Sequence, residues 1–166
     1  MSFYIVKEDI TKMEVDAIVN AANTALKMGG GVCGAIFRAA GIDKLTAACD
    51  QIGRIDTGQA VITDGFNLKA KYIIHTAGPI YDDSEREKSK KLLENSYKNS
   101  LILAKDNEIS SLAFPLISAG IYGYPKLEAF EIAKDVIDDF LKDNEMNIYL
   151  TIVDKELFNY LNIENY

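Results

Sequence analysis

Several features that would mark a membrane, secreted or disulfide-rich protein are missing from this sequence. No apolar run approaches the length of about 20 residues that a transmembrane helix needs, so we expect no membrane span. The opening residues, MSFYIVKEDI, lack a basic stretch followed by an apolar one, so we expect no signal peptide. Only two cysteines are present, Cys33 and Cys49, and they do not resemble a disulfide framework. These absences predict a cytoplasmic protein in a reducing compartment.

Positive charge is also scarce, and no stretch of the chain concentrates it. The formal net charge is −7, with 18 Lys and Arg residues against 25 Asp and Glu residues. Binding to a nucleic-acid backbone through charge needs basic clusters, so we do not expect nucleic acid as a partner. The charge does not exclude a small anion that is held by backbone N–H groups.

Linkers, internal repeats and low-complexity segments are missing as well. Only residues 78–91, GPIYDDSEREKSKK, resemble a polar excursion, and they lead directly into a helical pattern. Hydrophobic residues make up 48% of the sequence, which is enough for one sizeable core. We therefore expect residues 1–166 to form a single domain, and we expect this domain to be a monomer.

Apolar runs and helical patterns alternate along the chain. The expected strands are residues 3–6, 16–22, 59–65, 70–78, 110–117 and 147–153. Apolar residues recur every three to four positions in residues 92–104 and 127–141, which predicts two helices with one apolar stripe each. Residues 32–41 predict a short helix that ends at Gly41. This alternation predicts a three-layer α/β/α fold around a mixed, mostly parallel sheet.

Ligands in such sheets bind at the carboxyl ends of the strands, which selects the loops at residues 20–31, 78–84 and 117–125. The first loop runs into GGGVCG, residues 29–34. Glycines allow a close approach of the backbone, and the following helix offers free N–H groups, so this loop favours an anion such as phosphate. A dinucleotide-binding glycine motif is disfavoured, because NAANTALKM separates the glycines from the strand. A glycine-rich turn without function stays open.

The loop at residues 117–125, ISAGIYGYP, has the same chemistry. Ser118, Gly120 and Gly123 permit a second concave array of N–H groups, and the two tyrosines beside Gly123 offer flat faces for a sugar or a base. Two such loops predict a clamp on a diphosphate and hence a nucleotide-like ligand. Asparagine side chains in the first loop suit ribose hydroxyl groups.

The motifs, taken in order, resemble a macrodomain of the MacroD-like branch, which includes bacterial O-acetyl-ADP-ribose deacetylases. The resemblance lies in EDIT (8–11), VDAIVNAAN (15–23), GGGVCGAIFRAAG (29–41), TGQAVITDGFNLKAKYIIHTAGP (57–79) and LAFPLISAGIYGYP (112–125). It implies the macrodomain fold, ADP-ribose or an ADP-ribosylated protein as the ligand, and hydrolysis of ADP-ribosyl esters. We expect neither a metal nor a cofactor.

The resemblance also implies roles for single residues. Residues 9–10 would contact the adenine, residues 29–32 would wrap the phosphates from one side, and residues 118–122 would cover them from the other. The expected ligand-binding residues are Asp9, Ile10, Asn20, Asn23, Gly29, Gly30, Gly31, Val32, Ser118, Ala119, Gly120, Ile121, Tyr122, Asp154 and Phe158. Asn23 and Tyr122 would hold the distal ribose, and together with Cys33 they are the catalytic candidates.

The chain departs from the active MacroD-like pattern at two positions. That pattern continues from the glycine run as Val-Asp-Gly-x-Ile-His, and its Asp is taken to position or activate water. Here Cys33 replaces the Asp and Phe37 replaces the His. Two functions stay open: a hydrolase in which backbone and ligand phosphate position the water, and a non-catalytic reader of ADP-ribosylated targets. A module for RNA or poly-ADP-ribose is disfavoured by the acidic charge.

Several of these residues also have simpler interpretations. Cys33 could be a nucleophile, a redox-sensitive thiol, or a small residue that the site tolerates. Asp9 could cap a turn near Thr11, and the asparagines could satisfy loop backbone groups. His75, in the apolar run YIIHTAG, is expected to be structural rather than a base. The spacing of Cys33, Cys49 and His75 does not fit a zinc site.

Overall fold

Six strands form one sheet in the computed structural model, which describes the backbone of residues 2–165 and the side chains of residues 2–161. The strands are β1 (Ser2–Val6), β2 (Ala17–Ala22), β3 (Ala60–Asp64), β4 (Tyr72–Ala77), β5 (Ser111–Pro115) and β6 (Asn147–Thr151). Their order across the sheet is β1-β6-β5-β2-β4-β3. β3 pairs with β4 antiparallel, and the other pairings are parallel. The predicted mixed, mostly parallel sheet is confirmed.

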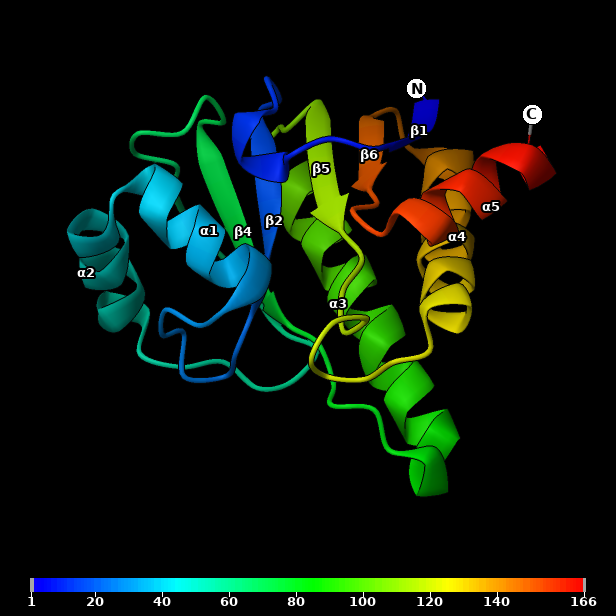
Figure 1. The fold of residues 1–166 in the computed structure, drawn as a ribbon. Helices are drawn as coiled ribbons and strands as arrows, with labels where there is room; N and C mark the ends of the chain where they lie inside the picture. Colours follow the sequence, from blue (N-terminus) through cyan, green and yellow to red (C-terminus); the bar gives the residue numbers. More distant parts are fainter. Residues whose placement is uncertain (1, 166) are drawn as a thin grey trace.

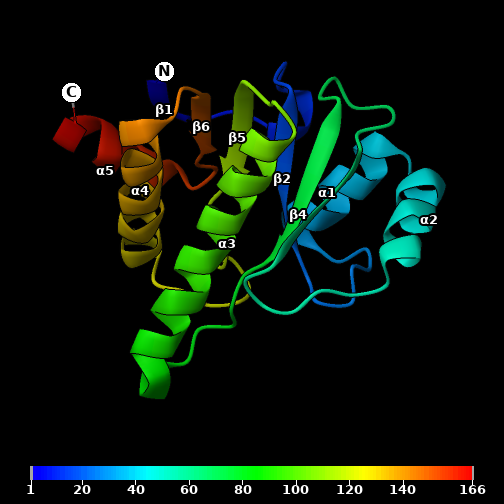
Figure 2. The same cartoon turned by 180° about the vertical axis from the view of Figure 1, so that it is seen from behind.

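Helices cover both faces of this sheet. They are α1 (Gly31–Ala40), α2 (Ile42–Ile52), α3 (Arg86–Asp106), α4 (Lys126–Asp143) and α5 (Lys155–Asn165), with two short 3-10 helices, η1 (Ile10–Lys12) and η2 (Asp83–Glu85). Helices α1 and α2 lie on one face and α3 and α4 on the other (Figures 1 and 2). The three-layer α/β/α architecture expected from the sequence is therefore confirmed.

The hydrophobic core is divided by the sheet into two clusters. One lies under α3 and α4 and contains Val19, Tyr97 and Phe114. The other lies under α1 and α2 and contains Ile18 and Phe37. Neighbouring residues of β2 thus face opposite clusters, as the alternation of side chains along a strand requires. Burial on both faces explains why β2 is apolar on both sides, with Asn20 as its one polar residue.

The sheet opens between β2 and β5 toward the carboxyl ends of its parallel strands. β2 pairs with β4 from Ala17 to Ala22, but it pairs with β5 only at Ala17 and Ile18. The chain also leaves these two strands toward opposite faces, because β2 leads to α1 and β5 leads to α4 (Figure 1). A pair of strands with this property is a topological switch point, and open α/β sheets bind their ligands there.

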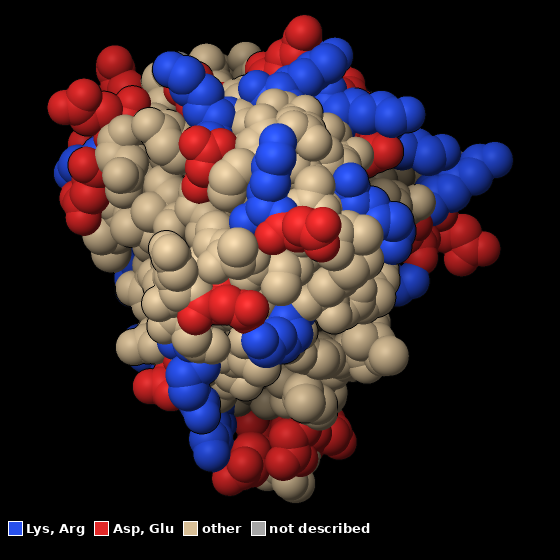
Figure 3. All heavy atoms as spheres, turned by 90° about the vertical axis from the view of Figure 1, so that its left-hand side faces the viewer, with Lys and Arg blue, Asp and Glu red and all other residues tan. Residues whose placement is uncertain are grey.

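The surface on the α2 side carries charges of both signs. Lys and Arg side chains gather toward one upper edge of this face, with Asp and Glu side chains among them, and acidic groups lie at the opposite edge and the bottom (Figure 3). Asp50 of α2 pairs with Lys27 at 2.6 Å, and Arg54 pairs with Asp56 at 3.7 Å. Within residues 2–165, no helix has the length and hydropathy needed to cross a membrane.

Candidate functional site

Loop 1 (residues 23–30) joins β2 to α1 and is shaped by its first residue. The Asn23 side-chain oxygen accepts a hydrogen bond from Lys27 N at 3.1 Å, and Asn23 Nδ2 donates to Lys27 O at 2.9 Å. The Lys27 ammonium group also binds Asp50 of α2 at 2.6 Å. Asn23 therefore closes the loop on itself, while the ion pair ties the loop to the neighbouring helix.

The N-terminus of α1 presents backbone N–H groups without a side-chain cap. Gly30 occupies the N-cap position and supplies no capping side chain, and Gly31 has a φ of 55°, which favours glycine. The first N–H groups of an α-helix have no intrahelical acceptor, and here they belong to Gly31, Val32 and Cys33. The helix dipole adds partial positive charge at the same place. This end of α1 is therefore suited to an anion.

Loop 1 lies directly on the first turns of α1. A Cβ atom at Gly34 would stand 2.6 Å from the carbonyl oxygen of Gly29, closer than any real contact. Glycine at position 34 thus lets the loop backbone touch the helix backbone. The close approach fixes the three-glycine segment over the end of α1.

A chain of buried polar side chains runs below loop 1. Thr63 Oγ1 lies 2.9 Å from His75 Nε2, and Asn20 Nδ2 lies 3.0 Å from His75 Nδ1. Because the Thr63 hydroxyl donates to Asp64 O at 3.2 Å, Nε2 of His75 is the donor to Thr63 and Nδ1 accepts from Asn20. Burial lowers the pKa of His75 to about 4, so the ring is neutral near pH 7. This geometry supports the structural interpretation of His75.

The Cys33 thiol is the upper end of this chain. Cys33 Sγ accepts from Asn20 Nδ2 at 3.7 Å and donates to Lys27 O at 3.7 Å, and the residue is buried. The thiol is thus held between an amide and a loop carbonyl. Asn20 is buried as well, and its side-chain oxygen has no hydrogen-bond partner among the described side chains (residues 2–161) and backbone groups (residues 2–165). A donor from outside the chain, such as a water molecule, can satisfy it.

Loop 2 (residues 116–125) joins β5 to α4 on the other side of the switch point. Ser118 is buried and adopts a φ of 66°, and Gly123 adopts a φ of 75°. Two backbone bonds close the turn, from Tyr124 N to Ser118 O at 2.9 Å and from Gly123 N to Gly120 O at 3.0 Å. In the part of the chain that the structure describes, the N–H groups of residues 120–122 have no acceptor. Loop 2 is therefore a second candidate anion site.

The segment after β4 fastens loop 2 in place. Ser118 Oγ donates to Pro79 O at 2.7 Å, and Tyr81 N donates to Tyr122 O at 2.9 Å. A Cβ atom at Gly78 would stand 2.4 Å from Ser118 Oγ, so only glycine allows this approach. Gly78 is the last residue of the predicted strand 70–78 and the first of the selected loop 78–84, and only the structure reveals its close approach to Ser118.

The residues expected on the adenine side lie after β1 and β6. Asp9 is exposed and caps η1, accepting from Thr11 N at 3.0 Å and from Thr11 Oγ1 at 2.7 Å through one carboxylate oxygen. These hydrogen bonds hold the pKa of Asp9 below its usual range. Asp154 accepts from Leu157 N at 2.9 Å and pairs with Lys126, which follows loop 2. The capping interpretation of Asp9 fits the structure, and its second oxygen stays available for a ligand.

All the predicted site residues lie near the carboxyl edge of the parallel strands, but their exposure differs. The exposed ones are Asp9, Gly29, Gly30, Gly31, Gly120 and Ile121. The half-buried ones are Asn23, Val32, Ala119, Tyr122, Asp154 and Phe158. The buried ones are Ile10, Asn20, Cys33 and Ser118. The structure brings Asn20 and Cys33 into contact, whereas the side-chain hydrogen bonds of Asp9 stay within η1.

Comparison with known proteins agrees with this architecture. A family profile for the macro domain matches residues 19–133. ADP-ribose glycohydrolase MACROD2 of Xenopus laevis is 51% identical over 148 residues, which cover 89% of this chain and 35% of that protein. This chain thus spans about a third of that relative's length. O-acetyl-ADP-ribose deacetylase of Salmonella newport is 45% identical over 157 residues, covering 92% of this chain and 87% of the deacetylase.

Solved structures give the same answer at the level of the fold. A variant of the Oceanobacillus iheyensis macrodomain with ADPR has a TM-score of 0.89 and 39% identity, covering 96% of this chain and 89% of that chain. The Trypanosoma brucei macrodomain in complex with ADP-ribose has a TM-score of 0.87 and 34% identity, covering 98% and 69%. The resemblance drawn from the sequence is confirmed: the chain belongs to the macrodomain family.

Proposed function

We propose that this chain binds ADP-ribose at the switch point between β2 and β5 and hydrolyses ADP-ribosyl esters. The observation that carries the proposal is the pair of backbone N–H arrays on either side of that point, at the start of α1 and in loop 2. The names of the relatives support it, since they include an ADP-ribose glycohydrolase and O-acetyl-ADP-ribose deacetylases. Related macrodomains solved with ADPR or ADP-ribose support the ligand.

The diphosphate of the ligand lies between the two loops. The N–H groups of Gly31, Val32 and Cys33 would bind it from one side, and those of residues 120–122 from the other. The adenine extends toward the free carboxylate oxygen of Asp9. The distal ribose lies over loop 1, where the Asn23 amide orients it and the Tyr122 ring packs on it.

Hydrolysis takes place at the ester on the distal ribose. With O-acetyl-ADP-ribose the products are ADP-ribose and acetate, and with a modified acidic side chain they are ADP-ribose and the free Asp or Glu. The attacking water is held between the distal ribose and a phosphate. The two N–H arrays fix the diphosphate and stabilise negative charge that develops in the transition state.

One observation favours a second function, a reader that binds ADP-ribosylated targets without cleaving them. Cys33 stands at the position of the Asp in the MacroD-like pattern that the sequence resembles. Its S–H donates to Lys27 O and its sulfur accepts from Asn20, so both contacts of the thiol lie within the protein. A thiol held in this way does not serve as a base for water.

Release of ADP-ribose from a protein modified on Asp or Glu separates the two functions. The assay is run under single-turnover conditions with this protein in excess, and a thermal shift with ADP-ribose establishes that the site is folded and occupied. Release above the blank without protein supports the hydrolase. ADP-ribose binding without release excludes hydrolysis of that ester and supports the reader.

A further inference from the structure

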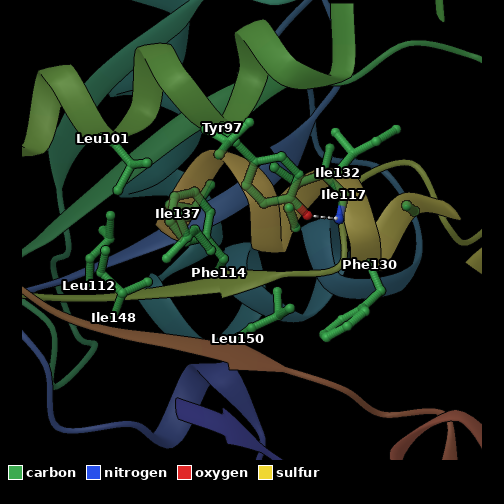
Figure 4. Packing of buried hydrophobic residues seen from close by; sticks show 14 of the residues in the cluster. Tyr97, Leu101, Leu112, Phe114, Ile117, Phe130, Ile132, Ile137, Ile148 and Leu150 are labelled. Carbon is green, nitrogen blue, oxygen red and sulfur yellow. Dashed lines mark hydrogen bonds between the residues drawn. The ribbon is translucent and has the colours of Figure 1, made fainter. Parts of the chain in front are cut away.

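Loop 2 begins over a buried hydroxyl group that belongs to α3. Tyr97 is 0% exposed, and its ring packs 5.1 Å from the ring of Phe114 in β5. Figure 4 shows its hydroxyl directed from the apolar cluster toward the backbone of Ile117. The hydroxyl accepts from Ile117 N at 3.0 Å and donates to Pro115 O at 3.3 Å. Burial raises the pKa of Tyr97 above its usual value, so the phenol keeps its proton and can donate.

These two backbone groups lie where β5 leaves the sheet. β5 pairs with β6 as far as Pro115, opposite Thr151, and Ile117 is beyond the last paired residue. Ile117 is nevertheless buried, and a buried N–H without an acceptor destabilises a protein strongly. The Tyr97 hydroxyl therefore accepts the hydrogen bond of Ile117 N at a point where no neighbouring strand pairs with the chain.

The restraint acts at the tightest point of loop 2. Ile117 immediately precedes Ser118, whose φ of 66° is strained for a residue other than glycine. Such a conformation persists only when the surroundings hold it. The hydrogen bonds of Ser118 to Pro79 O and from Tyr124 N hold it on the far side. Tyr97 holds the near side.

We propose that Tyr97 is a positioning residue for ADP-ribose binding, whose hydroxyl holds the first turn of loop 2 so that the N–H groups of residues 120–122 face the diphosphate. This inference rests on the proposed function. A phenylalanine ring would fill the same space in the core, so the hydroxyl group is explained by its two backbone contacts. Tyr97 is fully buried and reaches no ligand, and it acts through loop 2 alone.

The variant Tyr97→Phe tests the proposal because it removes one oxygen atom and keeps the ring. We expect the dissociation constant for ADP-ribose, measured by titration calorimetry, to rise about tenfold, the order expected when a buried N–H loses its acceptor. In the ester hydrolysis assay we expect KM to rise by a similar factor and kcat to stay within about twofold. If the Tyr97 hydroxyl only stabilised the fold, the variant would have a lower melting temperature and an unchanged dissociation constant for ADP-ribose.

Thr151→Val is the matched control. The Thr151 hydroxyl is also buried and also binds the backbone of β5, donating to Phe114 O at 3.0 Å, but it does so before loop 2 begins. We expect this variant to lower the melting temperature and to keep the wild-type affinity. Equal loss of affinity in both variants would show a general effect of weakening β5 and would overturn the proposal.

Other outcomes are equally decisive. A folded Tyr97→Phe protein with wild-type affinity overturns the proposal. Amide hydrogen exchange on the wild-type protein gives a test that needs neither ligand nor variant: Ile117 N–H should exchange as slowly as the amides of β5, and fast exchange there overturns the proposal. If wild-type protein fails to bind ADP-ribose, the proposed function is wrong. In that case, amide exchange of Ile117 N–H that is slow in the wild type and fast in Tyr97→Phe still shows that the Tyr97 hydroxyl holds the start of loop 2.

Discussion

Loop 1 and loop 2 offer the same kind of backbone surface to a ligand, yet the groups that hold them come from different parts of the chain. Loop 1 is held by the Asn23 bonds to Lys27, by the bond from Cys33 of α1 to Lys27 O, and by the buried side chain of Leu26. Loop 2 is held from below by the core, through Tyr97, and from the side by the bond between Ser118 and Pro79.

From this difference we expect the two loops to contribute differently to catalysis and to binding. Cys33 lies under loop 1 between Asn20 Nδ2 and Lys27 O, so a substitution there changes the hydrogen bonds beside the proposed ribose site. A loop built on buried groups keeps a fixed geometry and suits the binding of a phosphate group that does not vary among substrates. We therefore expect chemistry to change with substitutions under loop 1, and affinity and stability to change together with substitutions under loop 2.

The largest effect is expected from Cys33→Asp, which tests whether loop 1 controls the chemistry. An Asp carboxylate at the N-terminus of α1 would accept from Asn20 Nδ2 and could orient or activate water. We expect single-turnover ester hydrolysis to rise about 100-fold, the low end of what a general base supplies. Cys33→Asn is the uncharged control. An unchanged rate in a folded Cys33→Asp protein would mean that the rest of loop 1 is not arranged for hydrolysis.

The next largest effect is a pH dependence of stability that comes from His75 under loop 1. Its pKa is about 4 in the folded protein against 6.5 for a free side chain, so the unfolded chain binds the proton first as the pH falls. The stability that depends on neutral His75 is complete above pH 6.5 and declines toward pH 4. Between pH 7 and pH 5 the free energy of unfolding should fall by about 2 kcal/mol.

His75→Gln removes this term and keeps the carboxylates that titrate in both proteins. Chemical denaturation of both proteins at pH 7 and pH 5 measures the difference, and His75 is the only histidine in the sequence. Equal loss of stability in the two proteins would show that the imidazole is not buried and neutral as described.

A smaller effect separates the two loops through their tightly packed glycines. In Gly34→Ala the new methyl group meets Gly29 O, and in Gly78→Ala it meets Ile117 Cγ2 and Ser118 Oγ. Overpacking of this kind costs about 1–3 kcal/mol, which exceeds the gain of about 0.5–1 kcal/mol from alanine in a helix. Both variants should bind ADP-ribose more weakly, and Gly78→Ala should lower the melting temperature more. The reverse order of melting temperatures would contradict a loop 2 built on the core.

The smallest effect is expected from Asp50→Asn, which removes the ion pair that ties loop 1 to α2. Both partners are well exposed, at 61% for the Lys27 side chain and 49% for Asp50, so solvent and salt screen the pair. We expect a change in unfolding free energy of about 0.5 kcal/mol and an ADP-ribose affinity within about twofold of wild type. A much larger loss of affinity would mean that loop 1 depends on α2 more than its own contacts indicate.

The sequence predicted the strands well and the helices less completely. Each strand carries a contiguous apolar run, and all six predicted strands are present with their ends shifted by at most two residues. Helix α2 was missed because only Leu45 and Cys49 of it are buried, which leaves too short an apolar stripe. Helix α3 begins at Arg86, before the apolar pattern at Leu92, because its first turns extend beyond the sheet (Figure 1).

The sequence motifs predicted the two loops of the site, whereas the residues that support these loops became visible only in the structure. The two glycine loops follow strands in the sequence, and the parallel sheet brings them to one edge. The support below them could not be read from the sequence. Tyr97 belongs to a regular apolar stripe and is indistinguishable there from a core residue, and His75 meets Asn20 only through the pairing of β2 with β4.

If loop 1 and loop 2 hold one diphosphate between them, a titration with ADP-ribose followed by amide chemical shifts shows both loops responding to the same ligand. We expect the amide resonances of residues 29–34 and of residues 117–123 to shift together, with one common dissociation constant. Shifts confined to one loop, or two different dissociation constants, would contradict it.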